Sequence, residues 1–233
     1  MGGNLGTILG YKQQGATGEL RTPMMKDPAS AIILAGGRSS RMGQAKAALR
    51  FGPTTIIERL ISELLPAFDE LIVVAAPSAV ETFDANAVLR DWLPRIRLLR
   101  DEDAFAGPVP ALIRGLRAAQ NPRVFVCSCD VPLIRAKVAR ALCTMMGDSD
   151  AVVPEIAGKS QPLCAAYRRT AADQIERLSR AGHSRLTVIV EQIDCRRIGE
   201  AELRRIDPDL RSFLNVNTPT DYARAIAAAG FAP

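Results

Sequence analysis

Short apolar runs alternate with segments of helical spacing along most of this sequence, and this alternation restricts the fold more than any other feature. Apolar runs bounded by Gly, Pro or polar residues predict buried strands at 31–35, 71–75, 96–99, 124–127, 151–153, 161–167 and 195–198. Apolar residues at three- and four-residue spacing predict helices at 55–68, 108–119, 134–146, 171–181, 186–192 and 220–229. This order of elements predicts an α/β fold with a doubly wound, mainly parallel sheet.

The length and composition suit one large domain. The chain has 233 residues, of which 48% are hydrophobic and 24% charged, which allows a sizeable core. No internal repeat or linker divides it, so we expect a single domain over 29–233. Residues 1–28 contain glycines and scattered basic residues without a continuous apolar stretch, which predicts a flexible N-terminal extension rather than a signal peptide. No apolar run reaches the roughly 18 residues that span a bilayer, so we expect a cytoplasmic protein without a membrane partner.

The cysteines and the single histidine argue against several kinds of site. The five cysteines form no CxxC pair, and their odd number argues against a disulfide framework or a zinc site; they are Cys127, Cys129, Cys143, Cys164 and Cys195. We expect Cys127 and Cys129 to be small buried side chains of a strand. His183 is the only histidine and lies in a polar turn, so a histidine-dependent triad or metal cluster is not indicated.

The basic charge does not indicate a nucleic-acid partner. The formal net charge is +5, but acidic residues are interleaved with the basic ones and aromatic residues make up only 5% of the chain. Binding of single strands depends on aromatic stacking platforms. We therefore expect a solvated surface with one local anion site.

The segment from Leu34 to Lys46, which reads LAGGRSSRMGQAK, is the strongest functional signal. Gly36 and Gly37 allow the backbone to approach a ligand and leave amide N–H groups available for phosphate oxygens. Three basic residues follow within nine positions of this pair and add positive charge, namely Arg38, Arg41 and Lys46. A polar loop after a strand is the alternative, and the three basic residues favour phosphate binding over it.

Two familiar phosphate patterns are absent from this segment. A P-loop requires Gly-Lys-Ser/Thr after four intervening residues, but Gly43 is followed by Gln44. The dinucleotide pattern GxGxxG is also missing. The segment therefore indicates neither a P-loop kinase or GTPase nor a nicotinamide enzyme.

The segment resembles the LAGGxSxRMGxxK pattern of the molybdenum cofactor guanylyltransferases, within the nucleotidyltransferases of sugar-nucleotide type. Every fixed position of that pattern is filled here. The resemblance continues in order over residues 30–230, at Asp101 with Gly107-Pro108, at 129–132, at 161–167 and at 215–219. It implies a Rossmann-like nucleotide-diphospho-sugar transferase fold.

Asp130 follows an apolar strand and precedes Val131-Pro132. A carboxylate at the carboxyl end of a strand suits Mg²⁺, which prefers one or two carboxylates together with phosphate oxygens and water. An Asp that forms a turn or caps a helix is the alternative, and the resemblance implies the metal ligand. The resemblance also assigns Asp101 to the nucleotide site, although Asp101, Glu102 and Asp103 are adjacent and any of them could be solvated.

Asn215 and Asn217 are two residues apart in an extended segment, so their amide side chains are expected on the same side. Amides can hold phosphate or orient a metal-bound ligand without adding charge. Capping of the last helix by Asn217 or Thr218 is an alternative. The resemblance implies that Asn217 and, on weaker grounds, Gln161 lie on the acceptor side of the active site.

The resemblance implies transfer of GMP from GTP to the terminal phosphate of molybdopterin carrying molybdenum, with release of pyrophosphate. It implies catalysis by Arg41, Lys46 and Asp130 with Mg²⁺ as cofactor, and a nucleotide site that comprises Leu34, Ala35, Gly36, Gly37, Lys46, Asp101 and Asp130. GTP and the molybdopterin cofactor would be the substrates. Transient contact with proteins that supply the cofactor, or with molybdoenzymes, would follow.

Three departures from the family pattern affect the base and ribose region. Ala45 stands where Asp is common, Ala111 replaces a glycine in the segment 107–111, and the strand that ends at Ala75-Ala76 lacks an Asn found in some members. Ala35-Gly36-Gly37 favours GTP over CTP, because the cytidylyl relatives usually carry Ala-Ala-Gly. The alternatives are a nucleotidyltransferase that uses CTP or a sugar or alcohol phosphate, and a nucleotide-binding regulator that has lost turnover.

Overall fold

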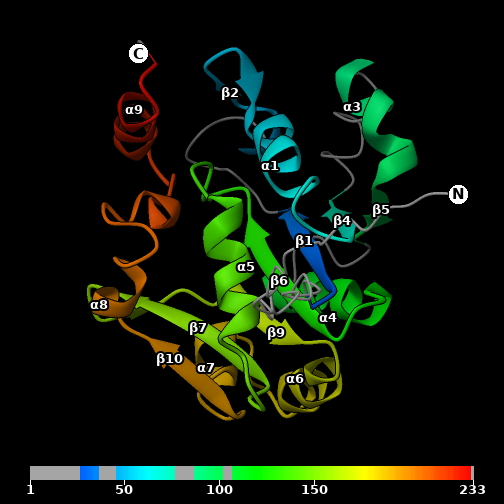
Figure 1. Cartoon of the computed structure of the whole chain (residues 1–233). Helices are drawn as coiled ribbons and strands as arrows, with labels where there is room; N and C mark the ends of the chain where they lie inside the picture. Colours follow the sequence, from blue (N-terminus) through cyan, green and yellow to red (C-terminus); the bar gives the residue numbers. More distant parts are fainter. Residues whose placement is uncertain (1–26, 37–45, 77–86, 102–106, 232–233) are drawn as a thin grey trace, which may run out of the picture.

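The central element of the structure is one twisted sheet with helices on both faces (Figure 1). The computed structural model describes residues 27–36, 46–76, 87–101 and 107–231. The sheet has the strand order β10-β7-β9-β6-β1-β4-β5, and β8 pairs with β7. Its strands are β1 (Ala29–Ala35), β4 (Glu70–Ala75), β5 (Arg97–Arg100), β6 (Arg123–Ser128), β7 (Ala151–Ile156), β8 (Lys159–Ser160), β9 (Cys164–Arg168) and β10 (Cys195–Ile198).

The sheet is mainly parallel, as the order of elements predicts. Strand β1 pairs in parallel with β4 and β6, and β4 with β5. Strand β9 lies between β6 and β7 and is antiparallel to both. Because β9 runs in the opposite direction, its first residue lies at the edge of the sheet where the parallel strands end. This places the segment before β9 beside the loops that follow β6 and β7.

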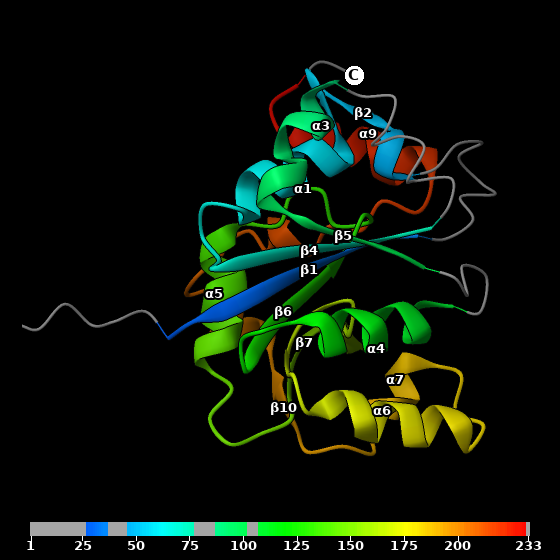
Figure 2. The same cartoon turned by 90° about the vertical axis from the view of Figure 1, so that its right-hand side faces the viewer.

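The alternation of side chains along each strand divides the core into two layers. All seven residues of β1 are buried; Ile33 packs with the layer of α1, α5 and α9, and Ile32 with that of α4, α6 and α7. Figure 2 shows α1 and α9 on one side of the sheet and α4, α6 and α7 on the other. The helices of these layers are α1 (Ile56–Leu64), α4 (Pro108–Ala118), α5 (Ala136–Thr144), α6 (Ala171–Arg180), α7 (Leu186–Ile189) and α9 (Pro219–Ala228). Helices α3 (Ala87–Trp92) and α8 (Glu200–Leu203) add Trp92 and Leu203 to the layer of α1.

Local sequence explains how two of these helices are placed. Thr55 and Glu58 form a reciprocal capping box at the start of α1, which satisfies backbone N–H groups that the first turn leaves unpaired. In α4, an added Cβ at Gly115 would lie 2.9 Å from Cδ1 of Ile32. Glycine at this position therefore allows α4 to pack closely on β1.

The structure corrects several predicted boundaries. The strand predicted at 161–167 begins only at Cys164, because Gln161 accepts a hydrogen bond from the Cys164 N–H in a turn and Pro162 has no N–H to donate. Helix α7 ends at Ile189 instead of Gln192, and α5 begins at Ala136. The hairpin of β2 (Arg50–Phe51) and β3 (Thr54–Thr55) was not predicted, because two-residue strands carry no periodic pattern.

The N-terminal extension and the possibility of a membrane-spanning helix were the remaining points of the chain's organisation. Residues 1–26 lie outside the described residues, so the flexible extension stays a prediction. The single domain over 29–233 also stays a prediction. Within the described ranges, no helix combines the length and the apolar character that a membrane crossing requires.

Candidate functional site

The carboxyl ends of the parallel strands meet at one edge of the sheet. Strand β1 is followed there by Gly36, β5 by Asp101, and β6 by the turn that carries Asp130. Ligands of open α/β sheets bind at this edge, where the connecting loops converge. Three of the residues singled out in the sequence therefore lie on the side of the molecule where a site is expected.

Asp101 and Gly36 face each other next to the end of β4. The Asp101 side chain is buried, with a residue exposure of 5%, and its N–H donates to the Ala75 carbonyl at 2.8 Å. A Cβ added at Gly36 would lie 3.6 Å from Oδ2 of Asp101. Leu34 and Ala35 are buried in the core, so only their backbone can contact a ligand. Gly37 and Arg41 lie outside the described residues.

Asp130 is held in the turn after β6 by its own neighbours. The Ser128 hydroxyl donates to Oδ1 of Asp130, and the Asp130 carbonyl accepts from the Val216 N–H at 2.7 Å. The second contact joins the segment before α9 to the end of β6. The Asp130 side chain is half-buried, so its carboxylate is both fixed and accessible.

Lys46 and Asn217 connect two parts of the chain that are 171 residues apart. The Lys46 ammonium donates to Oδ1 of Asn217 at 2.8 Å. Burial raises the pKa of the Cys129 thiol to about 12; the Asp130 carboxylate also raises this pKa, whereas the Lys46 ammonium lowers it. Both charged groups therefore lie near the Cys129 thiol.

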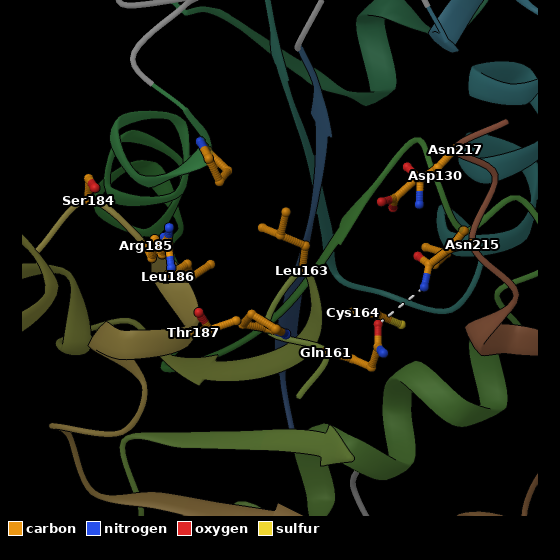
Figure 3. A pocket seen from close by; sticks show the side chains of 13 residues that line it. Asp130, Gln161, Leu163, Cys164, Ser184, Arg185, Leu186, Thr187, Asn215 and Asn217 are labelled. Atoms are coloured by element: carbon orange, nitrogen blue, oxygen red, sulfur yellow. Dashed lines mark hydrogen bonds between the residues drawn. The ribbon is translucent and has the colours of Figure 1, made fainter. Parts of the chain in front are cut away.

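A pocket of about 420 Å³ opens beside these residues. Figure 3 shows the side chains of 184–187 on one side of it, with Asp130, Asn215 and Asn217 on the opposite side and Leu163 between. Its polar lining consists of Asp130, Gln161, Ser184, Arg185, Thr187, Asn215 and Asn217, and its apolar lining of Pro108, Val131, Pro162, Leu163, Cys164 and Leu186. The pocket therefore combines a carboxylate, a guanidinium and three amides with apolar walls.

Gln161 reaches this pocket because the turn before β9 lies at the carboxyl edge. Nδ2 of Asn215 donates to Oε1 of Gln161 at 3.3 Å. Asn215 and Asn217 both line the pocket, as their two-residue spacing predicts. Thr218 caps α9 with its hydroxyl, and Asp221 completes the capping box. Thr218 is therefore the N-cap of α9, and the Asn217 side chain contacts Lys46 instead.

Sequence reasoning missed Ser184 and Arg185, which line the pocket from the connection between α6 and α7, and Thr187, which lines it from α7. No periodic pattern marks this loop. The only signal was an arginine with Ser184 before it and Thr187 two residues after it, and the many other arginines of the chain obscured it.

The cysteines are part of the core rather than of a redox or metal site. Cys127, Cys129, Cys143 and Cys164 are free and buried, and Cys195 is half-buried. Burial raises the pKa of Cys143 to about 12. Neutral thiols of this kind behave as small apolar side chains, as predicted for Cys127 and Cys129.

A mainly parallel sheet with a lysine, a carboxylate and amides gathered at the carboxyl ends of its strands defines an α/β protein equipped to handle phosphate groups. Residues 31–196 match the family model described as the MobA-like NTP transferase domain. The chain belongs to this family, and it is therefore a nucleotidyltransferase, as the sequence pattern predicted.

Curated relatives agree with this membership. The molybdenum cofactor guanylyltransferase of Desulfosudis oleivorans is 32% identical over 204 residues, which cover 87% of this chain and 96% of the relative. A protein of Chloroflexus aggregans named probable molybdenum cofactor guanylyltransferase is 37% identical, over 82% of this chain and 90% of the relative. The resemblance found in the sequence is thus confirmed.

A solved structure shows the same fold. Molybdopterin-guanine dinucleotide biosynthesis protein A from Archaeoglobus fulgidus superposes with a TM-score of 0.73 at 24% identity, over 86% of this chain and 98% of that one. The predicted nucleotidyltransferase fold is confirmed by this likeness.

Proposed function

We propose that this protein transfers GMP from GTP to the terminal phosphate of molybdopterin carrying molybdenum, with release of pyrophosphate. Family membership and the names of the curated relatives support this choice. The observation that carries it is the contact of Lys46 with Asn217 beside a pocket that Asn217 lines together with Asp130 and a cationic side chain, Arg185. One cation suits the triphosphate, and the other suits the acceptor phosphate.

No covalent nucleophile is needed in this reaction, because the acceptor phosphate itself attacks the α-phosphate of GTP. Catalysis comes from alignment of the two substrates and from neutralisation of developing charge. Lys46 stabilises the triphosphate, and we assign the same role to Arg41. The backbone of 34–37 closes on the nucleotide, and Asp101 faces its base and ribose.

The residues fit Mg²⁺ that arrives with the triphosphate. In the described part of the chain, no three His, Cys, Asp or Glu side chains gather as a metal cluster. Asp130 is one carboxylate beside amide oxygens, and Mg²⁺ is commonly held by one or two carboxylates with substrate phosphates and water. Asp130 would hold the ion, which supplies positive charge at the α-phosphate and the leaving group.

The pocket is proposed as the acceptor site. Arg185 offers a guanidinium for the terminal phosphate of the acceptor, and Asn215, Asn217 and Gln161 offer neutral hydrogen bonds. The apolar walls at Leu163 and Leu186 suit the flat ring system of a pterin. A cytoplasmic location and transient contact with cofactor-supplying proteins or molybdoenzymes stay predictions.

Pyrophosphate release with each of the four triphosphates tests the donor. With Mg²⁺ and molybdenum-loaded molybdopterin, we expect release with GTP and little with ATP, CTP or UTP. GTP at 100 times its Kd should stabilise the fold by about 2.7 kcal/mol, or about 5–10 °C in Tm for a chain of this size. Release with CTP and none with GTP would contradict the donor assignment. Binding without release for all four would favour a regulator.

Gly36→Ala is expected to weaken GTP binding about tenfold, or about 1.4 kcal/mol, and to change Tm by less than about 2 °C. The added methyl group would make only ordinary contacts, 3.6 Å from Ala76 Cβ and from Asp101 Oδ2, so the fold can accept it. It would occupy the space in front of the Asp101 carboxylate, where we place the nucleotide. Calorimetric titration with GTP measures the effect.

Gly199→Ala is the matched control, because an added Cβ there meets no atom within 4 Å and the residue does not line the pocket. Equal GTP affinity in the wild type and in Gly36→Ala would show that the nucleotide does not approach Gly36.

A further inference from the structure

Lys46 is the first residue of a compact unit that ends at the start of α1. It begins the 3₁₀ helix η1 (Lys46–Ala48), and its carbonyl accepts from the Leu49 N–H at 3.2 Å. The β2–β3 hairpin follows, and the Ile56 N–H then donates back to the Leu49 carbonyl at 2.9 Å. These contacts make 46–56 one structural unit, so a displacement of the hairpin also displaces Lys46.

The C-terminal segment holds this hairpin through three aromatic side chains, Phe51, Tyr222 and Phe231, which we call the aromatic clamp. The buried Phe51 ring meets the Tyr222 and Phe231 rings edge to face, with centroids 6.2 and 6.0 Å away. Such pairs contribute about 0.5–1.5 kcal/mol each beyond the area they bury. The Tyr222 hydroxyl also donates to the Arg50 carbonyl.

Phe231 packs directly on the turn of the hairpin. Gly52 has a φ of +66°, and an added Cβ would lie 2.7 Å from the Phe231 ring. Glycine is thus needed at this position both for the left-handed backbone and for the closeness of the ring. The hairpin turn and the end of the chain fit together without space for one methyl group.

The same helix begins in the candidate site. Asn217 immediately precedes the cap of α9, its N–H donates to Asp221 at 3.1 Å, and its side chain accepts from Lys46. Helix α9 has ten residues, which corresponds to about 15 Å. The 46–56 unit therefore contacts the C-terminal segment at Asn217 in the site and at the aromatic clamp, where Tyr222 lies near the start of α9 and Phe231 follows its end.

We propose that Tyr222 and Phe231 are positioning residues for Lys46: the aromatic clamp fixes the β2–β3 hairpin so that the Lys46 ammonium is presented to the triphosphate. This rests on the proposed function, which assigns Lys46 to that group. Both aromatic side chains contact the hairpin, at the Phe51 ring and, for Tyr222, at the Arg50 carbonyl, so both act through the hairpin.

Phe231→Ala tests the positioning role. Because Lys46 contacts the triphosphate before and during the reaction, we expect KM and Kd for the nucleotide to rise about tenfold and kcat to change less than about threefold. Phe231→Leu, which keeps an apolar contact, should recover most of the affinity. Tyr222→Phe, which loses only the hydroxyl, should raise KM about two- to threefold.

A control and a double mutant separate positioning from stability. Phe68 is also buried and stacks on Phe125, but it follows the end of α1, whereas the hairpin precedes the start of that helix, so Phe68→Ala should lower Tm and leave KM unchanged. In a Lys46→Ala background, Phe231→Ala should not weaken nucleotide binding further, because the group it positions is gone. All variants are compared at a temperature where melting curves show them folded.

The binding measurements test the positioning role of Tyr222 and Phe231 separately from the assignment of GTP as the donor. Kd is measured for GTP, CTP, ATP and UTP, and the ratio of variant to wild type is taken for whichever triphosphate the wild type binds. An unchanged Kd in folded Phe231→Ala, or an equal rise in the Lys46→Ala background, would overturn the positioning role. Binding of CTP instead of GTP would overturn only the donor, and binding of none of the four would overturn both.

Discussion

Asp130→Asn is expected to lower kcat about 10³-fold or more, which corresponds to about 4 kcal/mol of transition-state stabilisation. The substitution keeps the shape of the side chain but removes the negative charge that would hold Mg²⁺. The Asn amide oxygen can still accept from the Ser128 hydroxyl. The backbone contact of residue 130 with the Val216 N–H does not involve the side chain. We therefore expect Tm to stay within about 2 °C of the wild type.

The measurement is single-turnover pyrophosphate release at saturating GTP over a range of Mg²⁺ concentrations. Affinity for GTP in the absence of Mg²⁺ should change less than threefold, because Lys46 and the 34–37 backbone are untouched. A loss that appears mainly in kcat and in the Mg²⁺ requirement would be the mark of a metal ligand.

Asp209→Asn is the matched control for this experiment. Asp209 has a side chain that is 66% exposed, and it pairs with the exposed Arg211 at 3.1 Å. Removing its charge should leave kcat unchanged. If Asp130→Asn behaved like Asp209→Asn and kept full activity, Asp130 would not be the metal ligand, and its role would be that of a turn residue held by Ser128.

Much of the fold could be predicted because burial leaves a periodic trace in the sequence. Strand β1 is buried on both faces and reads as a continuous apolar run, and α1 reads as an amphipathic helix that starts at a capping residue. The direction of β9 could not be predicted, because an apolar run such as 164–167 is the same whichever way it enters a sheet. The direction depends on the length and path of the connection from β7.

Some residues of the candidate site could likewise be predicted from the sequence, and others could not. Asp101 and Asp130 could be singled out because a polar residue that follows an apolar run marks a strand end. The contact between Lys46 and Asn217 joins residues 171 positions apart, and only the three-dimensional path of the chain brings them together. Arg185 was missed for a related reason, since it enters the pocket from a loop on the opposite layer of helices.

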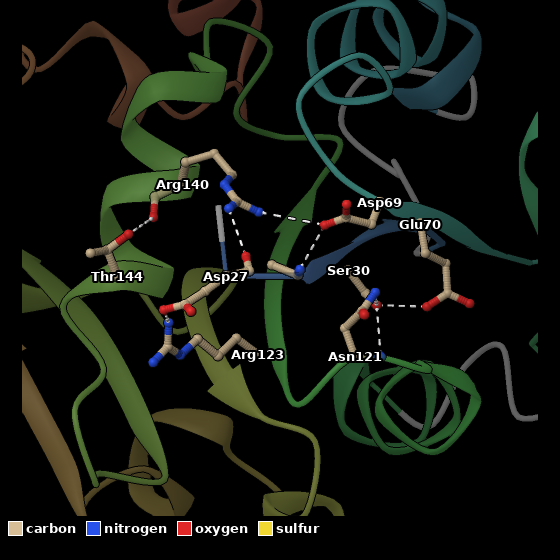
Figure 4. A network of polar contacts seen from close by, with 9 residues as sticks. Asp27, Ser30, Asp69, Glu70, Asn121, Arg123, Arg140 and Thr144 are labelled. Carbon is tan, nitrogen blue, oxygen red and sulfur yellow. Dashed lines mark hydrogen bonds and ion pairs between the residues drawn. The ribbon is translucent and has the colours of Figure 1, made fainter. Parts of the chain in front are cut away.

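The largest expected effect on stability lies at the opposite edge of the sheet, around Glu70. Its carboxylate accepts from the fully buried Ser30 hydroxyl at 2.6 Å, from the Gln120 N–H at 2.9 Å and from Arg97 at 2.6 Å. Asn121 in turn donates to the Ser30 hydroxyl at 3.0 Å. Figure 4 shows Ser30 between Glu70 and Asn121 at the beginning of β1. The network ties the amino ends of β1, β4 and β6.

Glu70→Ala is expected to lower the free energy of unfolding by about 3 kcal/mol, because it leaves the Ser30 hydroxyl and the Gln120 N–H without their acceptor and removes a charge-assisted bond to Arg97. For a chain of this length, Tm should fall by about 6–12 °C. The kcat of the folded fraction should not change, since this edge is remote from the pocket. Chemical denaturation measures the loss.

Glu176→Gln is the control for an acidic residue with comparable ion pairs. Glu176 contacts Arg117 at 2.7 Å and Arg180 at 3.0 Å on the surface, and exposed pairs contribute little. Tm should change by less than about 2 °C. A similar fall in Tm for both variants would show that the loss of ion pairs, and not the buried partners of Glu70, determines the effect.

The pH dependence of the Glu70→Gln variant distinguishes the charge of Glu70 from its shape. Burial alone would raise the pKa of Glu70, but hydrogen bonds from Ser30, Gln120 and Arg97 outweigh burial and lower this pKa below its ordinary value. A lowered folded pKa means that the ionised carboxylate stabilises the fold above about pH 5, and that this contribution is lost as the pH falls through the folded pKa. The difference in unfolding free energy between the wild type and Glu70→Gln should therefore be full at pH 7, begin to shrink near the ordinary pKa of a glutamate, and be lost below the lowered folded pKa, where both side chains are neutral. A difference that stays constant down to pH 3 would show that the carboxylate stabilises the strand ends by its shape and not by its charge.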